Sequence, residues 1–360
     1  MKPNNDNIPE NRTDRRTALK QILGLPVLGG LGYCASGLML EEQTLLSQES
    51  SPDSTKVSQE TDAQVDGVSG ATRTSWEMPK LETLKEPIPK AKIGDLEVSR
   101  VILGGNLMGG WAHSRDLIYV SELVKQYHTK EKVFQTFQLA EKCGINTFMG
   151  NPVMNQMLEE YWRWTDGKMQ FISDCGAGGK SMPDNVKLAI DFGCDACYIH
   201  GGICDSLVAN KDFKTIEECL RIMTDNGLPT GIGAHSQATV QGIVDAGLVP
   251  DFWMKTFHHK NYWSAQQNEA YSCFSVFCPE PDETREFMQN RDEPWIAFKI
   301  FAAGAIPPNE GFRFAFEGGA DFVCVGMYDF QIVDDINLCV DILKSPLNRK
   351  RRQLETLAMN

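Results

Sequence analysis

Eight short apolar segments alternate with helical segments between residues 98 and 343, and this alternation constrains the fold more than any other feature of the sequence. The apolar segments have the length and continuous hydrophobicity of parallel strands that are buried on both faces. The predicted strands are 98–105, 145–151, 169–175, 196–200, 229–235, 251–258, 295–302 and 321–327. The predicted helices are 129–143, 155–164, 183–192, 213–225, 238–246, 282–290, 308–317 and 333–343.

Eight such units within residues 91–345 predict an α/β fold of the (β/α)8 barrel type, which typically takes about 250 residues. A glycine follows several of the helices directly before the next strand, as expected of a helix stop. The competing prediction is a doubly wound open sheet. That fold calls for Gly-x-Gly-x-x-Gly after its first strand, whereas residues 101–106 read Val-Ile-Leu-Gly-Gly-Asn. We therefore expect the barrel.

The two ends of the chain differ from this central part. Residues 1–40 contain Arg15-Arg16 before an uncharged, glycine-rich stretch, and they resemble a twin-arginine export signal. This resemblance implies the twin-arginine machinery as a partner and a periplasmic or cell-envelope location. An uncleaved signal, or lipidation of Cys34, would attach the chain to a membrane. Residues 41–90 are polar and predict a disordered linker, and the basic residues of 346–360 predict a solvated tail without a function.

The charge balance excludes one class of partner. Asp and Glu number 48 against 35 Lys and Arg, which gives a formal net charge of −13. A chain this acidic is poorly suited to binding phosphate backbones, so we expect no nucleic-acid partner.

Polar residues gather where the predicted strands end. In a barrel of this type the active site is built at the carboxyl ends of the strands, so these side chains should share one pocket. Lys255 and Lys299 are unusual because each follows apolar residues of a strand, where a lone ammonium is costly to bury. The whole set is Asn106, Asn151, Asp174, His200, His235, Lys255, His258, His259, Lys299 and Asp329. The predicted catalytic residues are His200, Asp174, Lys255, Lys299 and His235.

Three stretches resemble aldo-keto reductases: residues 93–105, residues 139–147 and the strand that ends in Cys-Tyr-Ile-His at 197–200. The resemblance implies a barrel but carries over little of the catalytic set. The catalytic residues of the family are an Asp, a Tyr, a Lys and a His. In this chain Met149 stands at the Asp position, the Tyr position falls near Met154, and Asp174 occupies the Lys position. Only His200 matches. Residues 326–331 also lack basic side chains for a cofactor phosphate. Standard NADPH-dependent reduction is therefore not expected. The export signal leads to the same expectation, because NADPH is not available outside the cytoplasm.

A second resemblance lies in the linker. Residues 66–72, Asp-Gly-Val-Ser-Gly-Ala-Thr, are similar to the covalent flavinylation motif of flavin-carrying exported redox proteins. The resemblance implies a flavin transferase as a partner and FMN linked through its phosphate to Thr72, with Thr74 as the less favoured acceptor. The linker would then be a tethered redox arm.

Three functions follow from these features. The first is an exported flavoprotein oxidoreductase acting on a small carbonyl or carbohydrate-like substrate. In this function His200 donates a proton, and Lys255 or Lys299 stabilises oxyanion charge. The second is a lyase, epimerase or aldolase that uses a divalent metal or a lysine Schiff base. The third is a barrel that binds a ligand without catalysis. We favour the first.

Overall fold

The computed structural model describes residues 81–113, 117–176, 181–265, 275–351 and 354–357. The chain divides into two units, Met1–Met78 and Pro79–Asn360, and every described residue belongs to the second. The predictions made for the export signal, Cys34, the flavinylation motif and Thr72 therefore lie outside the described residues.

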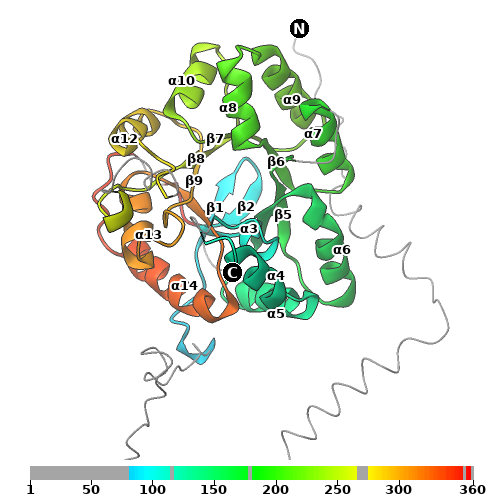
Figure 1. Ribbon diagram of the computed structural model, residues 1–360, viewed down its shortest axis with the longest axis vertical. Helices are drawn as coiled ribbons and strands as arrows, with labels where there is room; N and C mark the ends of the chain where they lie inside the picture. Colours follow the sequence, from blue (N-terminus) through cyan, green and yellow to red (C-terminus); the bar gives the residue numbers. More distant parts are fainter. Residues whose placement is uncertain (1–80, 114–116, 177–180, 266–274, 352–353, 358–360) are drawn as a thin grey trace, which may run out of the picture. The chain divides into compact units, whose positions relative to one another are not determined.

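Eight parallel strands close into a barrel in the order β10-β3-β4-β5-β6-β7-β8-β9, which confirms the predicted (β/α)8 fold. Helices surround the strands on all sides in Figure 1. The strands are β3 (Val101–Gly104), β4 (Thr147–Gly150), β5 (Gln170–Ser173), β6 (Ala196–Ile199), β7 (Thr230–Ala234), β8 (Phe252–Thr256), β9 (Trp295–Phe298) and β10 (Phe322–Val325).

Each of the eight predicted helical segments corresponds to a helix of the structure. The eight predicted ones are α5 (Lys130–Lys142), α6 (Asn155–Trp164), α7 (Met182–Asp191), α9 (Phe213–Asp225), α10 (Gln237–Asp245), α12 (Pro281–Gln289), α13 (Pro308–Glu317) and α14 (Asp329–Lys344). Three further α-helices in the described part of the chain were not predicted: α3 (Gly105–Met108), α4 (Val120–Tyr127) and α8 (Gly201–Ala209).

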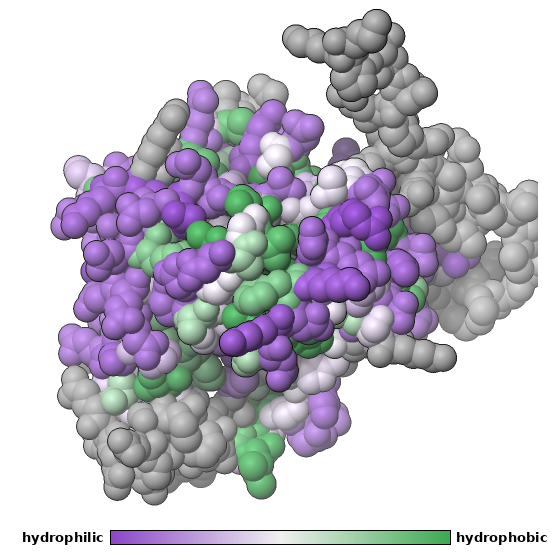
Figure 2. Space-filling model, turned by 90° about the horizontal axis from the view of Figure 1, so that it is seen from above, coloured by the Kyte–Doolittle hydropathy of each residue, from purple (hydrophilic) through white to green (hydrophobic). Residues whose placement is uncertain are grey.

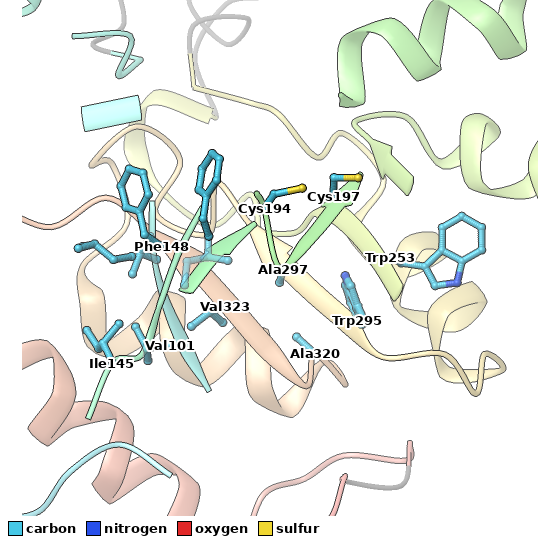
Figure 3. Close-up of a cluster of buried hydrophobic side chains, with 14 of the residues drawn as sticks. Val101, Ile145, Phe148, Cys194, Cys197, Trp253, Trp295, Ala297, Ala320 and Val323 are labelled. Carbon is cyan, nitrogen blue, oxygen red and sulfur yellow. The ribbon is translucent and has the colours of Figure 1, made fainter. Parts of the chain in front are cut away.

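The apolar strand residues form two layers. Ile102, Met149, Ile172, Met254 and Ile296 belong to one cluster inside the barrel. Their neighbours along the strands belong to a second, larger cluster with the surrounding helices, part of which Figure 3 shows around Phe148, Trp295 and Val323. Because successive side chains of a strand point to opposite faces, each strand contributes to both layers.

A hairpin precedes the barrel and was not predicted. β1 (Lys90–Ile93) pairs antiparallel with β2 (Leu96–Ser99) around Gly94, whose φ of +56° suits a tight turn. Ala91, Ile93 and Val98 pack with the inner cluster and so fill the end of the barrel at which the strands begin. Ile88 is buried as well, so the packed chain begins before residue 91, earlier than predicted.

Two of the basic residues after α14 do not belong to a solvated tail, which corrects that prediction. Arg349 and Arg351 are buried, and both bond to the carboxylate of Asp321, which directly precedes β10. Arg351 also donates to the carbonyl of Glu293 at 2.7 Å, and Arg100 donates to the carbonyl of Leu354 at 2.5 Å. The segment is therefore anchored across the end of the barrel at which the strands begin.

The outer surface is mainly hydrophilic on the face shown in Figure 2, with apolar side chains between the charged ones. This agrees with amphipathic helices that turn one face to the barrel. Among the helices in the described part of the chain, none combines the length and the apolar character needed to cross a membrane.

Candidate active site

A cavity of about 590 Å³ lies at the carboxyl ends of the strands. This volume falls within the range of small-molecule sites. Its polar lining comes from Asn106, His113, Asp174, Tyr198, His200, His235, Lys299 and Gln331, and its apolar lining includes Met149, Met254, Phe277, Phe298, Phe301 and Tyr328. The structure therefore brings four of the five predicted catalytic residues, all but Lys255, to one cavity.

Strained backbone surrounds this cavity. Five described residues other than glycine have positive φ. Four of them follow β5 or β9 at the carboxyl end of the barrel: Cys175 (50°), Lys299 (57°), Ala302 (48°) and Ala303 (56°), of which Lys299 and Ala303 line the cavity. Such conformations persist where the surrounding structure imposes them, and they cluster at functional sites. The left-handed conformation of the turn after β9 brings Lys299, Ala303 and their neighbours to the cavity wall.

Lys299 is the only lysine or arginine among the described residues that line the cavity. Its Nζ lies 2.9 Å from Nε2 of His113 and 4.4 Å from the centroid of the Phe277 ring. Burial lowers the pKa of Lys299 to about 8. Desolvation and the neighbouring Lys299 charge lower the pKa of His113 to about 4, so this imidazole is neutral at pH 7 and accepts the hydrogen bond from the ammonium.

His235 is oriented by a carboxylate that the sequence did not reveal. Nδ1 of His235 lies 2.9 Å from Oδ2 of Asp205 in α8, and the backbone N–H of His235 donates to both oxygens of Asp205 at 3.2 Å. Thr239 donates to Oδ1 at 2.6 Å. Burial by itself would raise the pKa of Asp205, but the hydrogen bonds from His235 and Thr239 outweigh it and lower that pKa. A carboxylate at Nδ1 favours the tautomer that leaves Nε2 as the proton acceptor.

Gly201 has no side chain, and this leaves room for the imidazole of His235. A Cβ on Gly201 would lie 2.9 Å from Cε1 and 3.1 Å from Nδ1 of His235, which is closer than side chains tolerate. Asp205 follows Gly201 by four residues in α8, so both lie on the helix face toward His235.

We expect Gly201→Ala to displace the His235 ring and break its bond to Asp205, with loss of the low-field proton resonance of Nδ1 in the NMR spectrum. Gly202→Ala is the matched control, because its Cβ would lie 3.5 Å from His200 in ordinary contact. Both variants add one alanine to the same helix and gain similar helix propensity. An unchanged Nδ1 resonance in Gly201→Ala would show that Asp205 does not hold the ring.

A carboxyl, an imidazole and a phenol line the cavity from the neighbouring strands β5 and β6. Asp174 accepts hydrogen bonds from the backbone of Gly176 at 2.7 Å and from Nδ2 of Asn151 at 3.2 Å. Burial raises the pKa of Asp174, and burial lowers the pKa of His200 although the charge of Asp174 opposes that shift. Tyr198 points inward from β6, and burial holds the pKa of its phenol well above the usual range. The phenol therefore stays protonated and is a hydrogen-bond donor for a ligand, a role that the sequence did not suggest.

Lys255 does not line the cavity. It is 1% exposed, and its ammonium donates to the carbonyl of His235 at 2.8 Å and to the carbonyl and hydroxyl of Thr256, both at 3.0 Å. Met254, its neighbour in β8, points into the cavity instead. Lys255 thus ties the end of β7 to the end of β8, and the structure gives it a supporting place rather than the predicted catalytic one.

Three further residues of the predicted polar set also have supporting places. Nε2 of His258 accepts from the backbone of Phe277 at 2.9 Å and of Cys278 at 3.0 Å, which holds the Phe277 wall of the cavity. Burial lowers the pKa of His258 to about 4. His259 lies 3.8 Å from Glu310, and Asp329 accepts from Lys132 at 3.0 Å.

No group of three or more His, Cys, Asp or Glu side chains suited to a metal ion occurs among the residues that the structure describes. The predicted possibility of a divalent metal held by Asp174, His200, His235 and His259 therefore gains no support from their arrangement.

Comparison with solved structures finds only distant similarities. A protein from Pseudomonas aeruginosa assigned to the aldo-keto reductases has 17% sequence identity and a TM-score of 0.48, over 73% of this chain and 99% of that one. The glycerol dehydrogenase of Gluconobacter oxydans has 11% identity and a TM-score of 0.46, over 70% and 90%. A truncated 3-deoxy-D-arabino-heptulosonate 7-phosphate synthase of Thermotoga maritima has 10% identity and a TM-score of 0.44, over 74% and 96%.

Structures similar to this chain thus include aldo-keto reductase barrels as well as a synthase barrel, and at these identities they carry no argument about activity. No protein-family model matches the sequence, and no curated protein is similar to it. The function has to be inferred from the site itself.

Proposed function

We propose that this protein is an exported oxidoreductase that interconverts a small carbonyl compound and its alcohol in the cavity, with FMN on Thr72 as the redox group. The observation that carries the proposal is the single cavity that combines an imidazole oriented by Asp205 with extensive aromatic and methionine lining. The imidazole suits the proton transfer that accompanies carbonyl reduction. The apolar lining suits a flat, largely apolar redox ring.

The lining favours a tethered flavin over a dissociable nicotinamide nucleotide. NADPH carries three phosphate groups, which proteins usually bind with several Arg or Lys side chains. Lys299 is the one such residue lining the described cavity. An FMN whose phosphate is esterified to Thr72 needs no phosphate pocket, because the covalent bond replaces it. This difference supports FMN as the cofactor of the proposal.

The chain length is compatible with a tethered cofactor. Thr72 precedes Thr83 by eleven residues, and Asn337 of α14 donates to the carbonyl of Thr83 at 2.9 Å. Eleven extended residues span up to about 36 Å. The eight residues of α14 from Asn337 back to Asp329, just after β10, rise only about 12 Å.

The residues of the cavity then have distinct roles. A bound flavin would supply or accept the hydride. Nε2 of His235 accepts the proton of an alcohol, or returns it to the forming alcohol, and Asp205 keeps the ring in position. Tyr198 and His200, from the neighbouring strand β6, donate hydrogen bonds to the substrate oxygen.

The proposal is tested by preparing the full chain together with a flavin transferase. We expect an intact mass increased by one FMN unit, a flavin visible spectrum, and loss of both in Thr72→Ala. Thr74→Ala is the matched control and should keep the modification. An unmodified, colourless wild-type protein would contradict the flavin proposal, and modification of Thr74 instead of Thr72 would correct the acceptor.

A lysine-dependent lyase, epimerase or aldolase is the second candidate, and one observation favours it. An amine whose pKa is about 8 is partly unprotonated at neutral pH, which is what Schiff-base formation requires. Borohydride reduction in the presence of a small ketone would then attach the ketone to Lys299, and Lys299→Arg would not be labelled. If neither flavin nor label is found, the binding-only barrel is the remaining function.

A further inference from the structure

We propose that the cavity binds its substrate through a carboxylate that pairs with the ammonium of Lys299, which makes the substrate a small 2-oxo or 2-hydroxy acid. This inference rests on the proposed function, because it names the substrate class of the same site. It assigns Lys299 to substrate recognition instead of to the reacting oxygen.

Lys299 is a half-buried cation that has no carboxylate partner in the described chain. Its one hydrogen bond goes to His113, a neutral imidazole that supplies no negative charge. Of the ammonium's three N–H donors, two remain for a ligand in the cavity that Lys299 lines. The charge of Asp205 favours the ammonium, but no described carboxylate lies within ion-pair distance of it, so a ligand that brings a negative charge gains most at this point.

Lys255 shows that the fold can satisfy a buried lysine without a ligand. Three protein oxygens lie within 3.0 Å of its Nζ. Lys299 directly follows β9, the strand next to β8, and it lacks such a set of oxygens. The contrast indicates that the oxygens missing at Lys299 come from a ligand.

The surroundings favour a single negative charge. One cation lines the described cavity, and the Asp174 carboxyl lines it too, so a phosphate dianion would be only partly neutralised. The Phe277 ring beneath the ammonium leaves an apolar wall beside it. A carboxylate matches this arrangement in charge and in its capacity to accept two hydrogen bonds.

The position of His235 decides where the reacting oxygen lies. The Phe298 ring centroid is 5.5 Å from the His235 ring and 5.9 Å from Nζ of Lys299. The His235 ring and Nζ of Lys299 are therefore no more than about 11 Å apart, and both line the same cavity. When the carboxylate of a ligand is on Lys299, the oxygen on the adjacent carbon faces the imidazole that Asp205 orients.

Binding of pyruvate to the full chain at several pH values tests this inference without any turnover. Calorimetry should show that pyruvate binds, that its neutral isostere pyruvamide binds at least tenfold more weakly, and that inorganic phosphate binds more weakly than pyruvate. Since the pKa of Lys299 is about 8, affinity should fall as pH rises above 8, by about 30-fold between pH 7 and pH 9.5.

Lys299→Met should remove both the affinity and its pH dependence, whereas Lys299→Arg should retain pyruvate binding at pH 9.5. Lys260→Met, at an exposed lysine, is the control and should behave as wild type. Equal binding of pyruvamide, tighter binding of phosphate, or undiminished pyruvate binding in Lys299→Met would each overturn the carboxylate assignment. A colourless protein that still binds pyruvate would refute the flavin proposal and leave this assignment standing, and a borohydride-trapped pyruvate adduct on Lys299 would refute this assignment.

Discussion

Asp321→Ala should lower the free energy of unfolding by about 3–5 kcal/mol, the range found when one partner of a buried ion pair is removed. Asp321 is 1% exposed and lies where the C-terminal segment meets the barrel. Its Oδ2 accepts from the backbone of Trp295 at 3.0 Å and from Arg351, and its Oδ1 accepts from Arg349 at 3.2 Å. The alanine variant would leave two guanidinium groups buried without their carboxylate.

Urea denaturation measures this effect, and Asp341→Ala provides its control. Asp341 also pairs with a basic residue, Lys85 at 2.6 Å, but both side chains are 54% exposed. An exposed pair of this kind contributes up to about 1 kcal/mol. If the two aspartate variants lost the same stability, the C-terminal segment would not be anchored by its charges.

The fold could be predicted because its signals are local. Each strand is a short apolar run, and helices such as α6 and α9 begin and end at the residues that the sequence indicated. The hairpin of β1 and β2 was missed because its four-residue strands alternate only briefly and the end of β2 was included in the strand predicted for 98–105. The C-terminal segment was misjudged because Asp321, its partner, lies about 30 residues away along the chain.

The site could be predicted only in part. Residues at the carboxyl ends of the strands meet in any barrel of this type. The position of His200, His235, Asp174 and Lys299 in the sequence was therefore enough to predict that they share a cavity. Strands that are apolar on both faces hide which alternate residues point inward, and this is why Lys255 was expected in a cavity that Met254 lines.

The residues that complete the site had no local signal. Asp205 belongs to α8, whose two leading glycines are poor helix formers and concealed that helix. His113 reaches Lys299 across 186 residues of sequence from an irregular segment after α3. The left-handed turn after β9 contradicts the strand predicted to continue to residue 302, because backbone strain of this kind is imposed by packing.

Asp335→Asn should stabilise the protein at pH 8 by up to about 3–4 kcal/mol and have little effect at pH 4. Asp335 lies on α14, is 4% exposed, and has no hydrogen bond or ion pair among the described residues. Burial, together with the charge of Asp334, raises the pKa of Asp335 to about 7. Each unit of such a shift corresponds to about 1.4 kcal/mol between the protonated and ionised forms.

The direction of the pH dependence follows from proton binding. Between pH 4 and pH 7 the folded protein keeps a proton on Asp335 that the unfolded chain has lost, so stability falls as pH rises through this range and levels off above it. An asparagine does not ionise and removes this loss, although its amide still has to be accommodated in the same buried place.

The difference in unfolding free energy between Asp335→Asn and wild type, measured at pH 4, 6 and 8, isolates this residue from the histidines that titrate in the same range. Asp334→Asn is the matched control, because Asp334 is the exposed neighbour in the same helix. It should add only the small gain expected from removing a repulsive charge. A difference that grows from pH 4 to pH 8 would agree with the raised pKa of Asp335, whereas a difference that stays constant over this range would show that burial does not shift that pKa.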